Sequence, residues 1–168
     1  MNLIKKIDEI VNSVLEVICI AVLVVLFLLL VLNVFFRFVP LYSMGWFDEI
    51  VELAFTSLTF FGAAYLWRHK EHSRIDFIQE KFENTKVEFI LELFITLIGM
   101  IFVVVFFKYS VALIGKTTAW SPIFKIPRKV FYVSMPISAI FMGIYSIRDL
   151  IYYTRQVFTD NKTKERIV

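Results

Sequence analysis

Cysteine and histidine are scarce in this sequence, and their scarcity excludes several kinds of site. Cys19 is the single cysteine, so neither a disulfide bond nor a thiolate metal site can form within one chain. The two histidines are His69 and His72, and no long apolar run contains one, which excludes a membrane haem with two histidine ligands. His69 and His72 could chelate a metal, but no carboxylate or cysteine completes a closed ligand set. We therefore expect no metal and no cofactor on this chain.

Glycine is also rare, with five residues, and no Gly-rich phosphate-binding loop is present. No nucleophile stands beside a base, so we expect that the protein is not an enzyme. The sequence has no internal repeat and no matched pair of short spans interrupted by glycine or proline, the pattern that marks the binding site of secondary transporters. The chain is therefore not expected to transport a substrate alone.

Hydrophobic residues are abundant instead. They make up 59% of the 168 residues, and the mean hydropathy is +0.75, which is typical of an integral membrane protein. We predict an all-α membrane protein in which residues 1–168 form a single domain of four transmembrane helices. The predicted spans are residues 15–37, 46–67, 87–108 and 129–153. The first span is too long for a signal peptide and lacks a small-residue cleavage site, so we expect it to remain as an anchor.

The second predicted span organises the rest of the chain. It begins at Trp46 with a cluster of carboxylates and ends at Trp67 before a basic cluster. Its 22 residues extend roughly 33 Å as a helix, enough to cross a bilayer core. Tryptophan at both ends is typical of the headgroup boundaries, and the basic end should face the cytoplasm.

The distribution of Lys and Arg predicts the orientation of all four spans. Twelve of the 18 basic residues lie on the side of the two termini, and six lie on the other side. Positive charge is retained on the cytoplasmic side, so we predict that both termini are cytoplasmic. The same rule accounts for the isoelectric point near 9.0 without a nucleic-acid partner.

Several local features accompany the spans. Residues 2–14 have the pattern of an amphipathic lead-in to the first span. Residues 75–84 are predicted to form a short amphipathic interfacial helix between spans two and three, headed by a capping-box pattern at Ser73 and Asp76. The third helix is expected to continue to about Gly115, and Pro136 is expected to kink the fourth span.

Charged residues within the spans are informative because a charge at the bilayer centre costs roughly 2.5–3.5 kcal/mol, and such residues usually face protein. We predict that they form pairs that fix the register of the helices. On the outer side, Arg37 is matched with Glu49 or Glu52. The set on the cytoplasmic side is Arg68, Arg74, Glu88 and Glu92.

The alternative to pairing is an ion or proton path, which would need polar residues at mid-depth. The residues available there are Thr56, Ser57, Thr59 and Thr96. Serine and threonine can bond back to their own helix, so we favour charge pairing over a path.

Two further groups of residues are candidates for contacts. Gly62, Ala63 and Ala64 form a small-residue patch that lets another helix come close, within the chain or between subunits. The outer connection carries basic residues with no acidic residue between them, namely Lys116, Lys125, Arg128 and Lys129. These charges either anchor the helices at lipid headgroups or help to orient a soluble partner that bears an acidic patch.

The order and spacing of these motifs resemble a known family. The matching residues are Arg37, Trp46, Glu49, the run 61–64, Arg68, His72 and Asp76, followed by Pro127, Tyr132 and Pro136. Together they resemble the small membrane subunit, the DctQ-type or Q subunit, of tripartite ATP-independent periplasmic (TRAP) transporters. The resemblance extends from Arg37 to about Tyr153.

This resemblance implies a scaffold subunit in a bacterial inner membrane. Its partners would be a large membrane subunit, which binds the sodium and carries the cargo, a periplasmic substrate-binding protein and membrane lipids. The cargo would be an organic acid, with sialic acid and C4-dicarboxylates as the candidates. The alternative is a self-contained oligomeric channel or exporter, but that class requires a carboxylate near the membrane centre, and Glu52 lies near the outer end.

Overall fold

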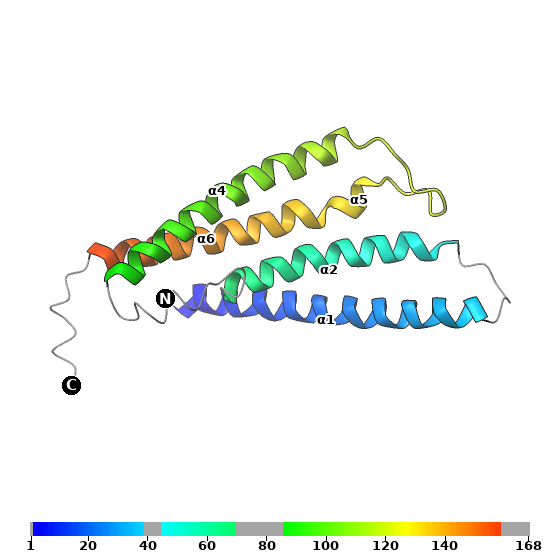
Figure 1. Ribbon diagram of the computed structural model, residues 1–168, viewed down its shortest axis with the longest axis horizontal. Coiled ribbons are helices and arrows are strands. Elements are labelled where there is room, and N and C mark those ends of the chain that lie inside the picture. Colours follow the sequence, from blue (N-terminus) through cyan, green and yellow to red (C-terminus); the bar gives the residue numbers. More distant parts are fainter. Residues whose placement is uncertain (1, 39–44, 70–85, 159–168) are drawn as a thin grey trace.

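The computed structural model describes residues 2–38, 45–69 and 86–158 (Figure 1). The long helices are α1 (Asn2–Phe38), α2 (Phe47–His69), α4 (Lys86–Lys116) and α6 (Ser134–Phe158), and the short helix α5 (Lys129–Tyr132) leads into α6. Four segments are long and apolar enough to cross a membrane. The predicted all-α fold with four spans is therefore confirmed.

The helices do not pack in the order of the chain. α1 lies against α2, α2 lies against α6, and α6 lies against α4 (Figure 1). The last helix in the sequence therefore lies between α2 and α4. It is also the most enclosed, because 39% of its most apolar stretch is buried, compared with 11%, 6% and 6% for the other three spans.

The bundle has two ends, which we name by the elements that meet there. At the terminal end α1 and α4 begin and α2 and α6 end; at the loop end α1 and α4 end and α2 and α5 begin (Figure 1). The start of α1 and the end of α6 thus share one end of the bundle.

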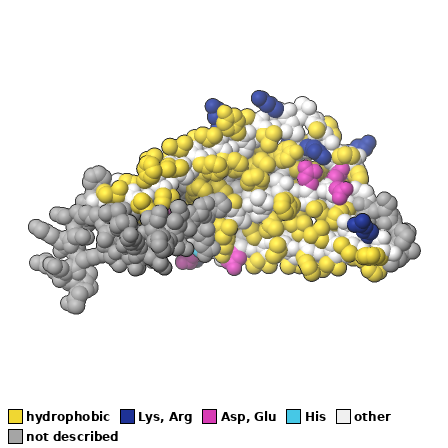
Figure 2. All heavy atoms as spheres, viewed as in Figure 1, with side chains coloured by type: hydrophobic (Ala, Val, Ile, Leu, Met, Phe, Trp, Pro, Cys, Tyr) yellow, Lys and Arg dark blue, Asp and Glu magenta, His cyan; other side chains and the backbone are white. Residues whose placement is uncertain are grey.

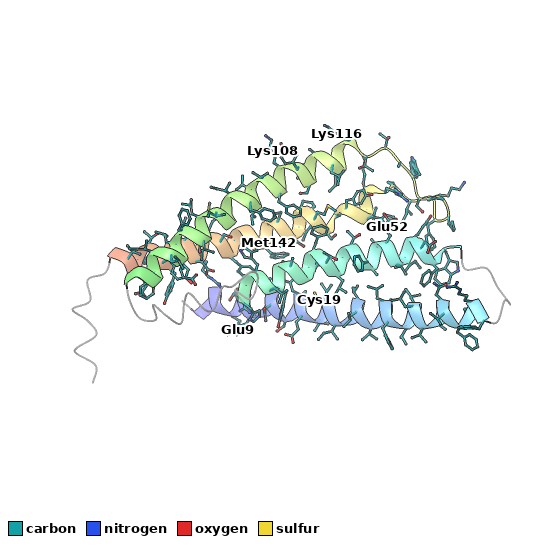
Figure 3. The ribbon with its side chains drawn as sticks, viewed as in Figure 1. Glu9, Cys19, Glu52, Lys108, Lys116 and Met142 are labelled. Atoms are coloured by element: carbon teal, nitrogen blue, oxygen red, sulfur yellow. The ribbon has the colours of Figure 1, made fainter. Side chains whose placement is uncertain are left out.

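The centre of the bundle is apolar. Ala64 of α2, Val103 of α4 and Met142 of α6 form a buried cluster, against which Trp67 packs (Figure 3). Glycine permits one close approach beside it, because a Cβ at Gly99 would lie 3.0 Å from the indole of Trp67. The lack of a side chain at Gly99 thus lets Trp67 of α2 pack directly against α4.

The outer surfaces of the helices are also apolar, as is expected for helices that face lipid. Phe27 on α1 is 65% exposed and Phe94 on α4 is 63% exposed. Figure 2 shows hydrophobic side chains over much of the face in view, and several charged side chains near the loop end. This surface cannot be covered by the described chain itself, so lipid or a partner must cover it.

Helix α1 differs from the predicted lead-in followed by a span. It runs without interruption from Asn2 to Phe38 because this stretch contains neither proline nor glycine. The amphipathic lead-in is therefore the first part of one helix of 37 residues, which is roughly 56 Å long. That is nearly twice the hydrocarbon thickness of about 30 Å, so α1 either projects from the bilayer or tilts within it.

The fourth span is interrupted close to Pro136. α5 ends at Tyr132 and α6 begins at Ser134, while Val133 keeps helical dihedral angles. Proline has no N–H, so Pro136 cannot donate to the carbonyl of Tyr132, the bond that would join the two helices. At the predicted position of the kink, the chain therefore lacks one backbone hydrogen bond between α5 and α6. Helix α4 reaches Lys116, which confirms the predicted continuation of the third helix, whereas the interfacial helix predicted at residues 75–84 lies outside the described residues.

Candidate functional site at the polar ends of the bundle

Residues 119–128, which we call the hairpin, fold back on themselves at the loop end. The N–H of Ser121 donates to the carbonyl of Ile126 at 2.9 Å, and the N–H of Arg128 donates to the carbonyl of Ala119 at 3.0 Å. These two bonds close an antiparallel pair of short arms. The connection that follows α4 therefore has a defined shape at the end of the bundle.

Glu49, in the first turn of α2, holds the tip of this hairpin. Its carboxylate accepts hydrogen bonds from the N–H of Ile123 at 2.8 Å, the N–H of Phe124 at 3.2 Å and the hydroxyl of Ser121. Only 7% of Glu49 is exposed, so its charge is buried and needs these donors. The contact links α2 to residues more than seventy positions later in the chain.

Two further contacts join the hairpin to α2 and to the turn that precedes it. One turn after Glu49, the carboxylate of Glu52 lies 3.6 Å from the guanidinium of Arg128 (Figure 3). A Cβ at Gly45 would lie 3.1 Å from the side chain of Ile123, so glycine there allows the tip to approach closely. The start of α2 thus contacts both the tip and the base of the hairpin.

The hairpin and the residues that flank it also carry exposed aromatic and basic side chains. Trp120 is 64% exposed and Phe124 is 44% exposed. Lys125 at the tip has a φ of 54°, a left-handed conformation that is uncommon outside glycine and asparagine. Lys116, Lys125 and Lys129 are all exposed, and Figure 3 shows Lys116 at the edge of α4.

The terminal end is held by a separate cluster of charges. Asp8 of α1 accepts two hydrogen bonds from Arg68 of α2, at 2.8 and 3.3 Å. The same carboxylate lies 3.8 Å from Arg148 of α6, which in turn contacts Asp149 at 3.0 Å. One carboxylate on the lead-in therefore ties three helices together.

Two further hydrogen bonds reinforce the terminal end. The indole N–H of Trp67 donates to the hydroxyl of Ser146 at 3.0 Å, which joins α2 to α6. His69 lies 3.1 Å from the side-chain amide oxygen of Asn12, which joins α2 to α1. His69 therefore has a structural contact on a neighbouring helix.

The predicted pairing of Arg37 with Glu49 or Glu52 is not the arrangement observed. Both carboxylates contact the hairpin, and within residues 2–38, 45–69 and 86–158 Arg37 forms no ion pair. The helix register gives the reason. Because Arg68 pairs with Asp8, Glu49 lies level with about residue 27 of α1, roughly 15 Å along the helix from Arg37.

The charged residues predicted to pair on the cytoplasmic side fall only partly within the described residues. The observed partner of Arg68 is Asp8, and Glu92 is buried on α4. Arg74 and the side chain of Glu88 lie outside the described residues, so their pairing stays a prediction.

The small-residue patch divides between two surroundings. Ala64 is fully buried in the central cluster, and Ala63 packs against that cluster. A Cβ at Gly62 would meet no atom within 4 Å. The patch therefore packs within the chain through its two alanines.

Polar groups in the middle of the spans are neutral. Thr56 donates to the carbonyl of Glu52 at 2.7 Å and Thr59 donates to that of Phe55 at 2.8 Å, which confirms the predicted bonding back to their own helix. The hydroxyl of Ser138 is fully buried on α6 and has no hydrogen-bond partner within the described part of the chain.

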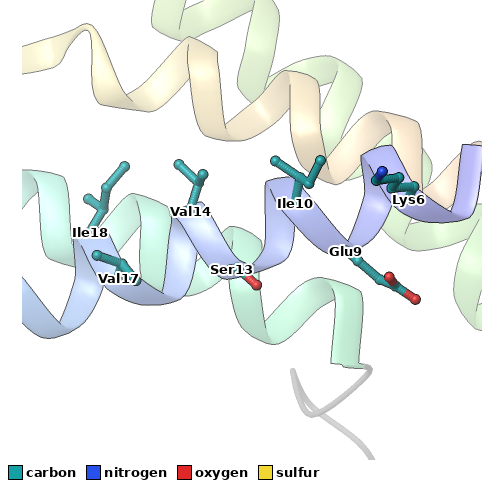
Figure 4. A pocket seen from close by; sticks show the side chains of 7 residues that line it. All are labelled: Lys6, Glu9, Ile10, Ser13, Val14, Val17 and Ile18. Carbon is teal, nitrogen blue, oxygen red and sulfur yellow. The ribbon is translucent and has the colours of Figure 1, made fainter. Parts of the chain in front are cut away.

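A groove of about 510 Å³ lies on the surface of α1 near the terminal end. Figure 4 shows Ile10, Val14 and Ile18 side by side along one face of the helix, with Glu9 and Ser13 pointing elsewhere. All the described residues that line the groove belong to α1.

Sequence reasoning missed both Ser121 and Asp8. Ser121 precedes Pro122, a pair that favours the start of a turn, so the turn could have been predicted but its carboxylate partner could not. Asp8 belongs to the lead-in, whose amphipathic pattern predicts only that a charged residue there avoids the apolar face. Its partner lies sixty residues away, which no local pattern indicates.

A family model described as "Tripartite ATP-independent periplasmic transporters, DctQ component" matches residues 26–156. A search among curated proteins gave no match. The matched residues include Glu49 and the whole hairpin, whereas Asp8 precedes them.

Proposed function

Because this chain belongs to the family of DctQ components, the small membrane components of tripartite ATP-independent periplasmic transporters, we propose that it is the scaffold subunit of such a transporter. It holds a static frame beside a large membrane subunit, which binds sodium and carries the cargo through the inner membrane of a bacterium. A periplasmic binding protein delivers the cargo, an organic acid for which sialic acid and C4-dicarboxylates are the candidates.

The observation that carries the scaffold role is the placement of the polar contacts. They join helix to helix or helix to hairpin at the two ends of the bundle, while Ala64, Val103 and Met142 form an apolar centre. A route for an anion or a cation would require polar groups at mid-depth, where a charge is costly. At that depth Thr56 and Thr59 bond to carbonyls of their own helix. This arrangement favours a rigid frame over a conduit.

The proposal places the loop end in the periplasm and the terminal end in the cytoplasm. The exposed lysines of the loop end, Lys116, Lys125 and Lys129, then face the binding protein. Arg128 contributes less to this surface because it contacts Glu52. Charges at the rim of an interface mainly raise the association rate and make it depend on salt.

Reconstitution tests the scaffold role directly. We expect that the purified chain in proteoliposomes with a sodium gradient gives only background uptake of radiolabelled sialic acid or succinate. With the large subunit and the binding protein of the same transporter, the same chain should support uptake of one of these acids. The large subunit with the binding protein but without this chain is the matched control, and it should be inactive. Sodium-driven uptake by the chain alone would reject the scaffold and favour the small-channel alternative.

Charge reversal tests the docking surface. Lys116→Glu combined with Lys125→Glu should raise the concentration of binding protein needed for half-maximal uptake and change its dependence on ionic strength, with the complex still assembled. If neither quantity changes, the lysines serve to anchor the helices at lipid headgroups.

A further inference from the structure

We infer that Glu49 is a positioning residue: it holds the hairpin in the shape that the periplasmic binding protein meets. This inference rests on the proposed docking function and adds a residue that docking does not touch directly. Glu49 is 7% exposed and lies beneath the hairpin, so it cannot form the docking surface itself.

The first support is the kind of atom that Glu49 contacts. Two of its three donors are main-chain N–H groups, those of Ile123 and Phe124, at 2.8 and 3.2 Å. These bonds fix the path of the backbone at the tip, and the path determines where the side chains of Phe124 and Lys125 point. The left-handed conformation of Lys125 follows directly after the bonded residues. Loss of the carboxylate would leave the N–H of Ile123 without its acceptor and the N–H of Phe124 with only the hydroxyl of Ser121, at 3.2 Å, and so would loosen the turn.

The second support is the distribution of charge. The carboxylates that contact the hairpin, Glu49 and Glu52, both approach it from α2. The hairpin itself contains no acidic residue, and Lys125 is exposed on its tip. Within the hairpin Arg128 is therefore paired with a carboxylate of α2, whereas Lys125 keeps its positive charge on the exposed tip. An acidic protein surface fits this positive tip.

Glu52 provides a matched control on the same helix. It lies one turn after Glu49, but its carboxylate contacts the side chain of Arg128 and no backbone N–H of the tip. Glu52→Gln should therefore leave the backbone of the hairpin unchanged. Glu49→Ala should not, and Glu49→Gln, which keeps the size but loses the charge, should fall between the two.

Hydrogen exchange of the amides measures the first half of the inference. Exchange is followed in the assembled membrane complex by mass spectrometry of peptides covering residues 117–128. Glu49→Ala should speed exchange at Ile123 by at least about tenfold, and by less at Phe124, whose N–H keeps the hydroxyl of Ser121 as an acceptor. Ser121→Ala removes one donor to the carboxylate and the second acceptor of the Phe124 N–H but keeps the carboxylate, so it should give a smaller increase at Ile123. It also keeps the test decisive if a Glu49 variant fails to assemble. Unchanged exchange in Glu49→Ala, or an equal increase in Glu52→Gln, overturns the inference.

The uptake assay measures the second half. Glu49→Ala should raise the half-saturating concentration of the binding protein several-fold while maximal uptake per assembled complex stays unchanged. A purely structural defect would instead lower the amount of complex and hence maximal uptake. Faster exchange with an unchanged half-saturation overturns the positioning role. If the double charge reversal at Lys116 and Lys125 leaves the half-saturating concentration unchanged, the docking function itself fails. That failure can be told apart from failure of the positioning role, because the double variant keeps Glu49.

Discussion

At the scale of single residues, the indole of Trp67 is held between two helices. Its N–H donates to Ser146 of α6, and its ring lies over Gly99 of α4. The ring atoms would lie 3.0 and 3.2 Å from a Cβ at Gly99, closer than side chains normally pack. Glycine at this position is therefore needed for packing and not for an unusual backbone conformation.

Gly99→Ala should destabilise the protein. The methyl group would displace the indole and weaken its bond to Ser146, and overpacking of this kind costs about 1–3 kcal/mol. The gain in helix propensity offsets at most about 1 kcal/mol of that cost. Thermal unfolding of the purified protein in detergent measures the difference. Gly62→Ala is the control, since its Cβ meets no atom within 4 Å and should be neutral or slightly stabilising. Equal effects of the two substitutions would contradict the packing role of Gly99.

The sequence indicated that Glu49 is unusual but not what it contacts. A carboxylate in a span predicts a buried partner, and a basic side chain is the partner that pattern reasoning considers first. The observed donors are backbone N–H groups of Ile123 and Phe124, which every residue but proline possesses and which carry no sequence signal. Arg37 was a plausible partner only as long as the register of α1 against α2 was unknown.

At the scale of elements, the contacts of Asp8 with Arg68 and Arg148 fix the start of α1. Among the long helices α1 packs mainly against α2, and most of its apolar surface is exposed. Apolar contacts with one neighbour allow a helix to slide, because lipid is as apolar as leucine. The two hydrogen bonds from Arg68 to Asp8 select one register.

A double-mutant cycle on Asp8 and Arg68 tests whether this ion pair stabilises the contact between α1 and α2. The side chains are 29% and 16% exposed, so removal of one partner leaves a poorly solvated charge. We expect Asp8→Ala and Arg68→Ala to be non-additive by about 1 kcal/mol in unfolding free energy in detergent. Arg68→Lys keeps the charge but cannot form both bonds, so it should recover only part of the stability. Plain additivity within the error of the measurement would show that the two residues do not act together.

The helices themselves were predictable because their cause is local. Hydropathy over about twenty residues defines each span, and the absence of N–H on Pro136 explains the separation of α5 from α6. The continuity of α1 followed from the absence of a helix breaker, although the change from an amphipathic to an apolar pattern suggested two elements. A change of pattern marks where the environment of a helix changes, and it does not require the helix to end.

At the scale of the whole molecule, α1 begins and α6 ends at the same end of the bundle, which allows a test of membrane topology. Because twelve of the 18 basic residues are predicted to lie on the cytoplasmic side, a reporter fused after Val168 should read as cytoplasmic. A reporter inserted at Thr118, just before the hairpin, should read as periplasmic. The reverse pattern would place the exposed lysines of the loop end in the cytoplasm and remove the docking proposal.

The order of helices across the bundle was not predictable from the sequence. A helix in lipid is apolar around its whole circumference, so hydrophobic periodicity does not show which face meets a neighbour. The position of α6 between α2 and α4 depends on long-range pairs such as Trp67 with Ser146. Such pairs become visible only when the spans are placed together.

That position has a consequence for how the chain is made. Synthesis proceeds from the N-terminus, so α6 is the last of the four helices to leave the ribosome, yet α2 and α4 each pack against it. Before α6 enters the membrane, α2 and α4 lack this common neighbour, and contacts such as the stacked rings of Phe60 and Phe106 join them without it. A nascent chain that stops before Ser134 therefore lacks the helix that α2 and α4 share as a neighbour, and completion of this final helix closes the bundle.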